Sequence, residues 1–114
     1  MKVEFLEKLY NIIEERKNAA SENSYVKSLF SGGVTKINEK VLEESLELLE
    51  ATLDESEEKR EKVIHETADL WFHTIVLLSN EGIDIKEVIK ELESRFGKSG
   101  ILEKASREVS EEEK

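Results

Sequence analysis

The segment from Val63 to Leu78 constrains the fold more than any other part of the chain. At the helical step of about 100° per residue, its apolar side chains point in almost every direction, and a helix that is apolar on all sides is normally buried on all sides. One narrow polar stripe interrupts this surface, formed by Lys62, Glu66, Asp69, His73 and Asn80. Because charges on a buried helix are costly unless they are paired or hold a metal, this stripe marks a candidate functional site.

Helical periodicity extends over the rest of the chain. Apolar residues recur every three or four positions, no segment alternates as a strand would, and the sequence contains no proline. Ser24 is placed to cap a short helix that ends at the turn Gly32-Gly33. Asp54 and Asp84 each stand three residues before a glutamate, in the pattern of a helix capping box. The predicted helices cover residues 2–19, the segment between Ser24 and Gly32, and residues 34–53, 54–81 and 84–97.

These helices predict an all-α bundle of four to five helices. At 114 residues and 13.1 kDa the chain has the size of one domain, so we expect a single domain over residues 1–114. The bundle would occupy about residues 1–97, followed by a highly charged C-terminal tail over residues 98–114.

Composition excludes several classes of function. The chain carries 27 acidic and 17 basic residues, a formal charge of −10, so it lacks the basic surface that nucleic acids and anionic membranes require. It has no cysteine and only two histidines, which argues against disulfides, thiolate chemistry and a typical zinc site. No apolar run reaches membrane-spanning length and the N-terminus lacks a secretory core, so we expect a cytoplasmic protein that binds neither nucleic acid nor membrane.

The carboxylates of two segments indicate where the chemistry lies. Glu44 and Glu47 form an E-x-x-E pair, and Glu66 and Asp69 form an E-x-x-D pair, each on one face of a predicted helix. If the two helices pack antiparallel, four carboxylates converge, and such a group must be protonated, paired with lysines or bound to a cation. Oxygen ligands select a hard cation, Mg²⁺ first, with Mn²⁺ as a substitute.

Two other interpretations of these carboxylates remain open from spacing alone. In the first, they form surface salt bridges with nearby basic residues, since E-x-x-E is common on charged helices. The basic residues in question are Lys36, Lys40, Arg60 and Lys62. A carboxylate-bridged di-iron site is the other competitor, but it needs Glu-x-x-His motifs, and neither histidine follows a glutamate at that spacing.

Several motifs in a fixed order give the sequence a family resemblance. They are SYVKSL at 24–29, GVTKI at 33–37, KVLEESLE at 40–47, HETADLWFH at 65–73, and the tail segments GKSG at 97–100 and EKASR at 103–107. In this order they resemble the phosphoribosyl-ATP pyrophosphohydrolases, which belong with the MazG-type all-α nucleotide pyrophosphohydrolases. Val26 and Leu42 stand where the family usually has threonine and glycine, and neither position is a candidate metal ligand.

The resemblance implies a reaction and roles for particular residues. The reaction is Mg²⁺-dependent hydrolysis of phosphoribosyl-ATP to phosphoribosyl-AMP and pyrophosphate, the second step of histidine biosynthesis. Glu44, Glu47, Glu66 and Asp69 would hold the metal, and Glu43 would be an extra ligand, a base or only a solvated residue. Candidate substrate-binding residues are Ser24, Tyr25, Lys36, Lys40, Lys62 and Lys98, with Arg16 and Lys17 as weaker candidates.

Plainer structural roles compete for some of these residues. Tyr25 either stacks on the adenine or ribose or packs inward from a Ser-capped helix. His73 is expected to make a supporting hydrogen bond behind the carboxylates, and His65 to be a surface or packing residue.

Three wider expectations follow. An all-round apolar helix needs more cover than this chain provides, so we predict a homodimer, as the family resemblance also implies. A house-cleaning pyrophosphohydrolase for dUTP or damaged nucleoside triphosphates is the nearest alternative function. A non-enzymatic helical interaction module is a distant one, because selection for packing alone would not leave a polar stripe on the most apolar helix.

Overall fold

The computed structural model describes residues 3–18 and 24–97, and within them the protein is entirely helical, which confirms the predicted all-α fold class. The helices are α1 (Val3–Lys17), α2 (Tyr25–Ser31), α3 (Gly33–Ala51), α4 (Lys59–Asn80) and α5 (Ile85–Phe96). The chain divides into two compact units, Met1–Ile83 and Asp84–Lys114. Residues 19–23, between the first two predicted helices, and the predicted C-terminal tail over residues 98–114 lie outside the described residues.

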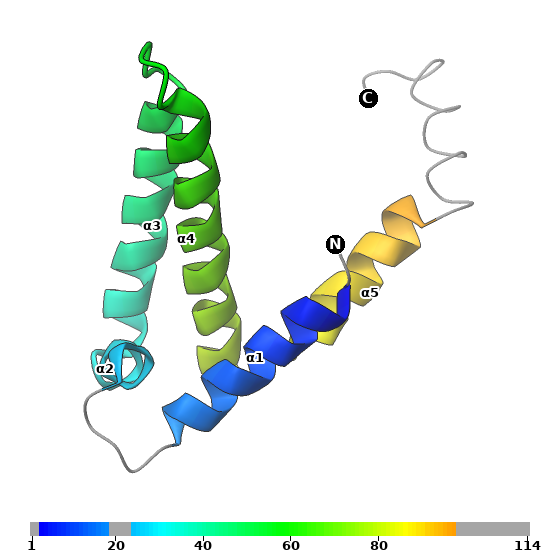
Figure 1. The fold of residues 1–114 in the computed structure, drawn as a ribbon. Coiled ribbons are helices and arrows are strands. Elements are labelled where there is room, and N and C mark those ends of the chain that lie inside the picture. Colours follow the sequence, from blue (N-terminus) through cyan, green and yellow to red (C-terminus); the bar gives the residue numbers. More distant parts are fainter. Residues whose placement is uncertain (1–2, 19–23, 98–114) are drawn as a thin grey trace. The chain divides into compact units, whose positions relative to one another are not determined.

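An antiparallel pair of long helices forms the centre of the first unit. Figure 1 shows α3 and α4 side by side, joined by a short turn at one end, with α2 across the start of α3. Helix α1 packs against α2 and α4. The fully buried side chains that join these helices are Ile13, Leu29, Ile37, Val76 and Ser79.

Local signals place the ends of most helices as predicted. The Ser24 hydroxyl accepts a hydrogen bond from the Lys27 backbone N–H at 3.3 Å and so caps α2. Gly33 and Gly82 have positive φ angles of 82° and 71°, which glycine adopts without strain, and they reverse the chain after α2 and after α4. In the second unit, Asp84 and Glu87 form the predicted capping box at the start of α5.

The predicted helix start at Asp54 is wrong. Helix α4 begins at Lys59, and its first flanking residue, Glu58, makes no capping hydrogen bond through its side chain. Asp54 instead accepts a hydrogen bond from the Ser56 N–H at 2.6 Å and pairs with the ammonium of Lys62. The hydrogen bond from Lys62 is the main reason why the pKa of Asp54 lies well below its usual value. The segment from Asp54 to Glu58 is therefore a turn, closed by the ion pair between Asp54 and Lys62.

Burial of α4 is incomplete within a single chain. Ile64 and Trp71 are 56% and 49% exposed, although the sequence pattern predicts burial on every side. Exposed apolar side chains also line α3 at Leu42, Leu46 and Leu49, and Leu53 follows just beyond its end. Among the described residues, no helix combines the length and apolar character needed to cross a membrane.

Candidate metal centre

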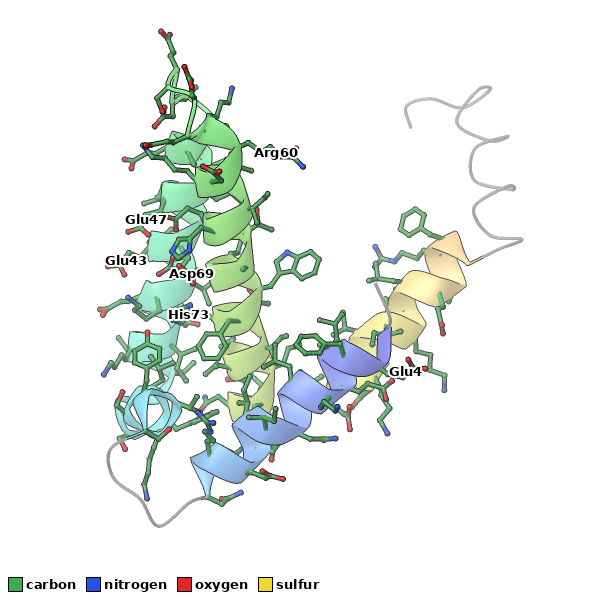
Figure 2. The ribbon with its side chains drawn as sticks, viewed as in Figure 1. Glu4, Glu43, Glu47, Arg60, Asp69 and His73 are labelled. Carbon is green, nitrogen blue, oxygen red and sulfur yellow. The ribbon has the colours of Figure 1, made fainter. Side chains whose placement is uncertain are left out.

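Three carboxylates from the antiparallel pair converge on one point. Glu44 of α3 and Glu66 and Asp69 of α4 each offer an oxygen atom, and these atoms all lie within 4.8 Å of one another. The sequence spacing explains the arrangement, because Glu66 and Asp69 are one helical turn apart and face the α3 residue across the pair. Figure 2 shows the same region, with Glu43 and Glu47 along α3 and Asp69 and His73 along α4.

Burial and charge make this cluster unfavourable without a cation. The Glu44 residue is only 6% exposed. Its burial, reinforced by the negative charges of Glu47 and Asp69, raises the pKa of the Glu44 carboxyl to about 7. A carboxyl with this pKa is about half protonated at neutral pH, and a bound cation would stabilise its ionised form.

Two buried oxygen atoms of the cluster lack hydrogen-bond partners among the described residues. Oε1 of Glu44 and Oε1 of Glu66 are buried and have no hydrogen-bond partner within the described part of the chain. Buried carboxylate oxygens are almost always hydrogen-bonded, so two orphans within one cluster need an explanation. An all-oxygen donor set with two such orphans fits a hard divalent cation such as Mg²⁺.

Glu47 lies beside this group without joining it. The side chain is exposed, and its oxygens are not among those within 4.8 Å of one another. Its charge nevertheless contributes to the raised pKa of Glu44. The structure therefore brings together three of the four predicted ligands, and a ligand role for Glu47 stays a prediction.

Lys40 and Glu43 form an ion pair at the edge of the centre. The Lys40 ammonium lies 2.6 Å from Oε1 of Glu43 and 3.8 Å from Oε2 of Glu44. The hydrogen bond from Lys40 lowers the pKa of Glu43, which is an exposed residue. Lys40 is thus within reach of the cluster, and Glu43 is positioned as its counter-charge.

The imidazole of His73 contacts the backbone of Asp69, and its predicted supporting role at the centre stays a prediction. Its Nδ1 lies 2.8 Å from the Asp69 carbonyl oxygen, and its Nε2 lies 2.8 Å from the Tyr25 hydroxyl. The carbonyl can only accept, so in the neutral imidazole Nδ1–H donates to it and Nε2 accepts from Tyr25. The Tyr25 ring also stacks on Phe72 at 6.3 Å between centroids, which is the packing alternative for this half-exposed residue.

His65 has a contact that the sequence analysis missed. Its Nε2 lies 3.2 Å from Oδ2 of Asp69, one turn along the same helix. The i, i+4 spacing of the two residues was the available signal.

The remaining predicted binding residues have varied surroundings. Lys62 is paired with Asp54, and the Lys36 ammonium donates to the Ser28 carbonyl at 3.3 Å. Arg16 is exposed near the end of α1. The predicted substrate-binding residue Lys98 lies outside the described residues.

Lys17 has a structural role in this chain. It donates to the Ser79 carbonyl at 3.0 Å, pairs with Glu14 at 3.3 Å and lies 5.1 Å above the Phe30 ring. The residue therefore ties the end of α1 to the end of α4.

A cavity adjoins the carboxylate cluster. It has a volume of about 600 Å³ and shares Glu47 and Glu66 with the region of the cluster. Its other lining residues are Glu50, Ala51, Leu53, Asp54 and Lys62. An open cavity beside a carboxylate centre gives a ligand direct access to any cation held there.

The fold and the carboxylate cluster together define a class, the all-α proteins with clustered carboxylates between two antiparallel helices. Comparison with known proteins narrows this class. Residues 6–96 match the family model described as phosphoribosyl-ATP pyrophosphohydrolase. The chain belongs to this family, as its sequence motifs suggested.

Curated relatives agree with the family match. A phosphoribosyl-ATP pyrophosphatase of Vesicomyosocius okutanii subsp. Calyptogena okutanii is 48% identical over 104 residues, covering 91% of this chain and 96% of the relative. A phosphoribosyl-ATP pyrophosphatase of Geobacter metallireducens is 47% identical over 104 residues, covering 91% of this chain and 93% of the relative.

Proposed function

We propose that this protein hydrolyses phosphoribosyl-ATP to phosphoribosyl-AMP and pyrophosphate, in the second step of histidine biosynthesis. The names of its curated relatives support the substrate, and the family match supports the reaction. The observation that carries the chemistry is the convergence of Glu44, Glu66 and Asp69 with two buried oxygens that lack partners.

We further propose that Glu44, Glu66 and Asp69 hold Mg²⁺, with Glu47 at the open side of the centre. When bound there, Mg²⁺ would neutralise phosphate oxygens and polarise the scissile phosphoanhydride. The donor chemistry supports this choice, since carboxylate oxygens are the ligands that Mg²⁺ prefers in proteins.

The surrounding side chains have defined tasks in this proposal. Lys40 lies beside Glu44, where its ammonium can offset charge on a phosphate oxygen. Lys62 lines the adjoining cavity and can do the same once it parts from Asp54. Glu43 is the exposed carboxylate nearest to Lys40 and is the candidate to accept a proton from the attacking water.

We also propose that the protein acts as a homodimer in the cytoplasm. The exposed apolar side chains of α3 and α4 support the association, because a monomer rarely leaves so many large apolar residues on two neighbouring helices. A two-fold pairing through these faces would complete the burial of α4 that the sequence pattern predicts.

Pyrophosphate release tests the proposed reaction. The purified protein is incubated with phosphoribosyl-ATP, dUTP or ATP, each with Mg²⁺ or with EDTA. We expect Mg²⁺-dependent release from phosphoribosyl-ATP, and a loss of about a hundredfold or more in Glu44→Gln. Glu39→Gln, an exposed glutamate on the same helix, is the matched control and should retain activity.

The alternative functions predict other outcomes. Release from dUTP or ATP in preference to phosphoribosyl-ATP would indicate a house-cleaning enzyme with the same centre. No release from any of the substrates, with no stabilisation by Mg²⁺, would indicate the non-enzymatic interaction module instead.

A further inference from the structure

A second cavity lies where α2 meets α3. It has a volume of about 570 Å³ and is lined by Lys27, Ser28, Ser31, Gly32 and Lys36. None of these described lining residues carries a carboxylate, in a chain whose formal charge is −10. The cavity beside the carboxylate cluster is lined instead by four carboxylates, Glu47, Glu50, Asp54 and Glu66, and by one lysine, Lys62. The described lining residues of the two cavities therefore carry net charges of opposite sign, and the cavity at α2–α3 has the ammonium and hydroxyl donors that suit an anion.

The glycine of this cavity fixes the path of one lysine. A Cβ atom at Gly32 would lie 2.3 Å from Cδ and 2.8 Å from Cβ of Lys36, so only glycine lets the Lys36 stem lie against the turn. From this position the Lys36 ammonium reaches the Ser28 carbonyl at 3.3 Å. One bond leaves two of its three N–H donors for other acceptors, and the packed stem reduces the entropy lost on binding.

The position of the cavity relates it to the metal centre. Lys36 and Glu44 lie on α3 eight residues apart, which corresponds to about 12 Å along the helix axis. Helix α2 supplies Lys27, Ser28 and Ser31 to the cavity. Its first residue, Tyr25, is hydrogen-bonded to His73 of α4, which lies one helical turn from Asp69. An elongated ligand with anionic groups at both ends can therefore contact the cation site and the basic cavity together.

We propose that this cavity binds a phosphate monoester, namely the phosphate that ends the phosphoribosyl arm of the substrate. This inference rests on the proposed function and deepens it, because that arm is the part of phosphoribosyl-ATP that ATP lacks. Lys36 and Lys27 are the charged donors, and the hydroxyls of Ser28 and Ser31 are the neutral ones. The cavity thus selects phosphoribosyl-ATP over ATP, while the carboxylate centre acts on the polyphosphate that both share.

Binding of ribose 5-phosphate in EDTA tests the cavity without catalysis. We expect the amide resonances of Ser28, Ser31 and Gly32 to shift on titration of the full chain. The double variant Lys27→Gln/Lys36→Gln should weaken this binding at least about tenfold, since it removes both charged donors. Lys36→Arg should preserve it, and Lys90→Gln, an exposed lysine of α5, is the matched control. Circular dichroism of each variant establishes that it is folded.

Kinetics with two substrates give the second readout. In the double variant, kcat/KM for phosphoribosyl-ATP should fall at least about tenfold through KM, while kcat/KM for ATP should stay within about twofold of wild type. Equal losses on both substrates, or an unchanged ratio, would overturn the proposed cavity.

The two proposals fail in different ways. If the protein hydrolyses phosphoribosyl-ATP but ribose 5-phosphate shifts no cavity amide, the cavity assignment is wrong and the proposed function stands. If ribose 5-phosphate binds at the cavity but phosphoribosyl-ATP is not hydrolysed, the phosphate site stands and the proposed function is wrong.

Discussion

The hydroxyl of Tyr25 lies 2.8 Å from Nε2 of His73, and this contact connects the first residue of α2 to the helix that carries Glu66 and Asp69. The other imidazole nitrogen holds the Asp69 carbonyl, so one ring joins a short helix to the backbone of a candidate metal ligand. Substitutions in α2 should therefore alter the position of Asp69 in the candidate metal centre.

Tyr25→Phe tests this connection. The substitution keeps the ring that stacks on Phe72 but leaves the buried His73 without its partner at Nε2. We expect a loss of about 1 kcal/mol in the free energy of unfolding and a lower kcat/KM for phosphoribosyl-ATP. Urea unfolding and steady-state kinetics measure the two effects, and an unfolding free energy equal to wild type would contradict the prediction.

Asp69→Asn should separate stability from activity. In EDTA the amide removes one negative charge beside Glu44, so we expect the melting temperature to rise or stay unchanged. With Mg²⁺ present, stabilisation by the metal and pyrophosphate release should both fall steeply. Thermal denaturation with and without Mg²⁺ measures the first effect. A variant that responds to Mg²⁺ as strongly as wild type would show that Asp69 is not a ligand.

Mg²⁺ binding should release a proton below neutral pH. The pKa of Glu44 is about 7 in the metal-free protein, so this carboxyl is mostly protonated at pH 6 and mostly ionised at pH 8. A cation needs the ionised form, so the apparent affinity should fall up to about tenfold for each pH unit below 7 and level off above it. Calorimetry in buffers of different ionisation enthalpy counts the protons. Equal release at pH 6 and pH 8 would be inconsistent with this pKa.

Ser79→Ala should be destabilising only where Glu14 is ionised. The hydrogen bond from the buried Ser79 hydroxyl is the main reason why the pKa of Glu14 lies below its usual 4.5. A lowered pKa in the folded state stabilises the protein above 4.5, and this gain is lost as the pH falls through the folded-state pKa. We therefore expect a cost of about 1 kcal/mol at pH 7 that shrinks toward pH 3.

Urea unfolding at both pH values measures this difference. Ser94→Ala, on the exposed surface of α5, provides the control and should show no such change with pH. A cost for Ser79→Ala that is the same at pH 3 and pH 7 would mean that packing, not the hydrogen bond to Glu14, sets its effect.

Trp71→Glu should shift the protein from dimer to monomer. Trp71 is 49% exposed on α4 although it is large and aromatic, so a charge there would enter the proposed interface. Light scattering after size-exclusion chromatography measures the mass, and Trp71→Phe should remain dimeric. A monomeric wild-type protein would refute the proposed association directly.

Periodicity was sufficient to predict the elements and most of the centre. The helical pattern fixes which residues share a face and so groups Glu44, Glu66 and Asp69, and the structure brings oxygen atoms of all three within 4.8 Å of one another. Glu47 shares the spacing of these residues, yet its side chain is exposed. Sequence spacing predicts only roughly in which direction a side chain leaves its helix. How the partner helix packs then decides which carboxylate oxygens come close together.

Contacts between distant segments were beyond sequence reasoning. Tyr25 and His73 are separated by 48 positions, and Lys17 and Ser79 by 62, so both contacts depend on how α1 and α2 pack on the long pair. The start of α4 was predicted wrongly for a local reason. The capping pattern at Asp54 competes with the Lys62 ammonium, and the ion pair prevails.

The short turn between α3 and α4 also has a consequence for the order of assembly. Glu44, Glu66 and Asp69 all fall within one continuous helical hairpin that ends at Asn80. Contacts that are local in sequence form fastest, because little chain entropy is lost in closing them. The hairpin therefore holds all three candidate cation ligands before α5 is synthesised, so the candidate centre can form ahead of the last helix.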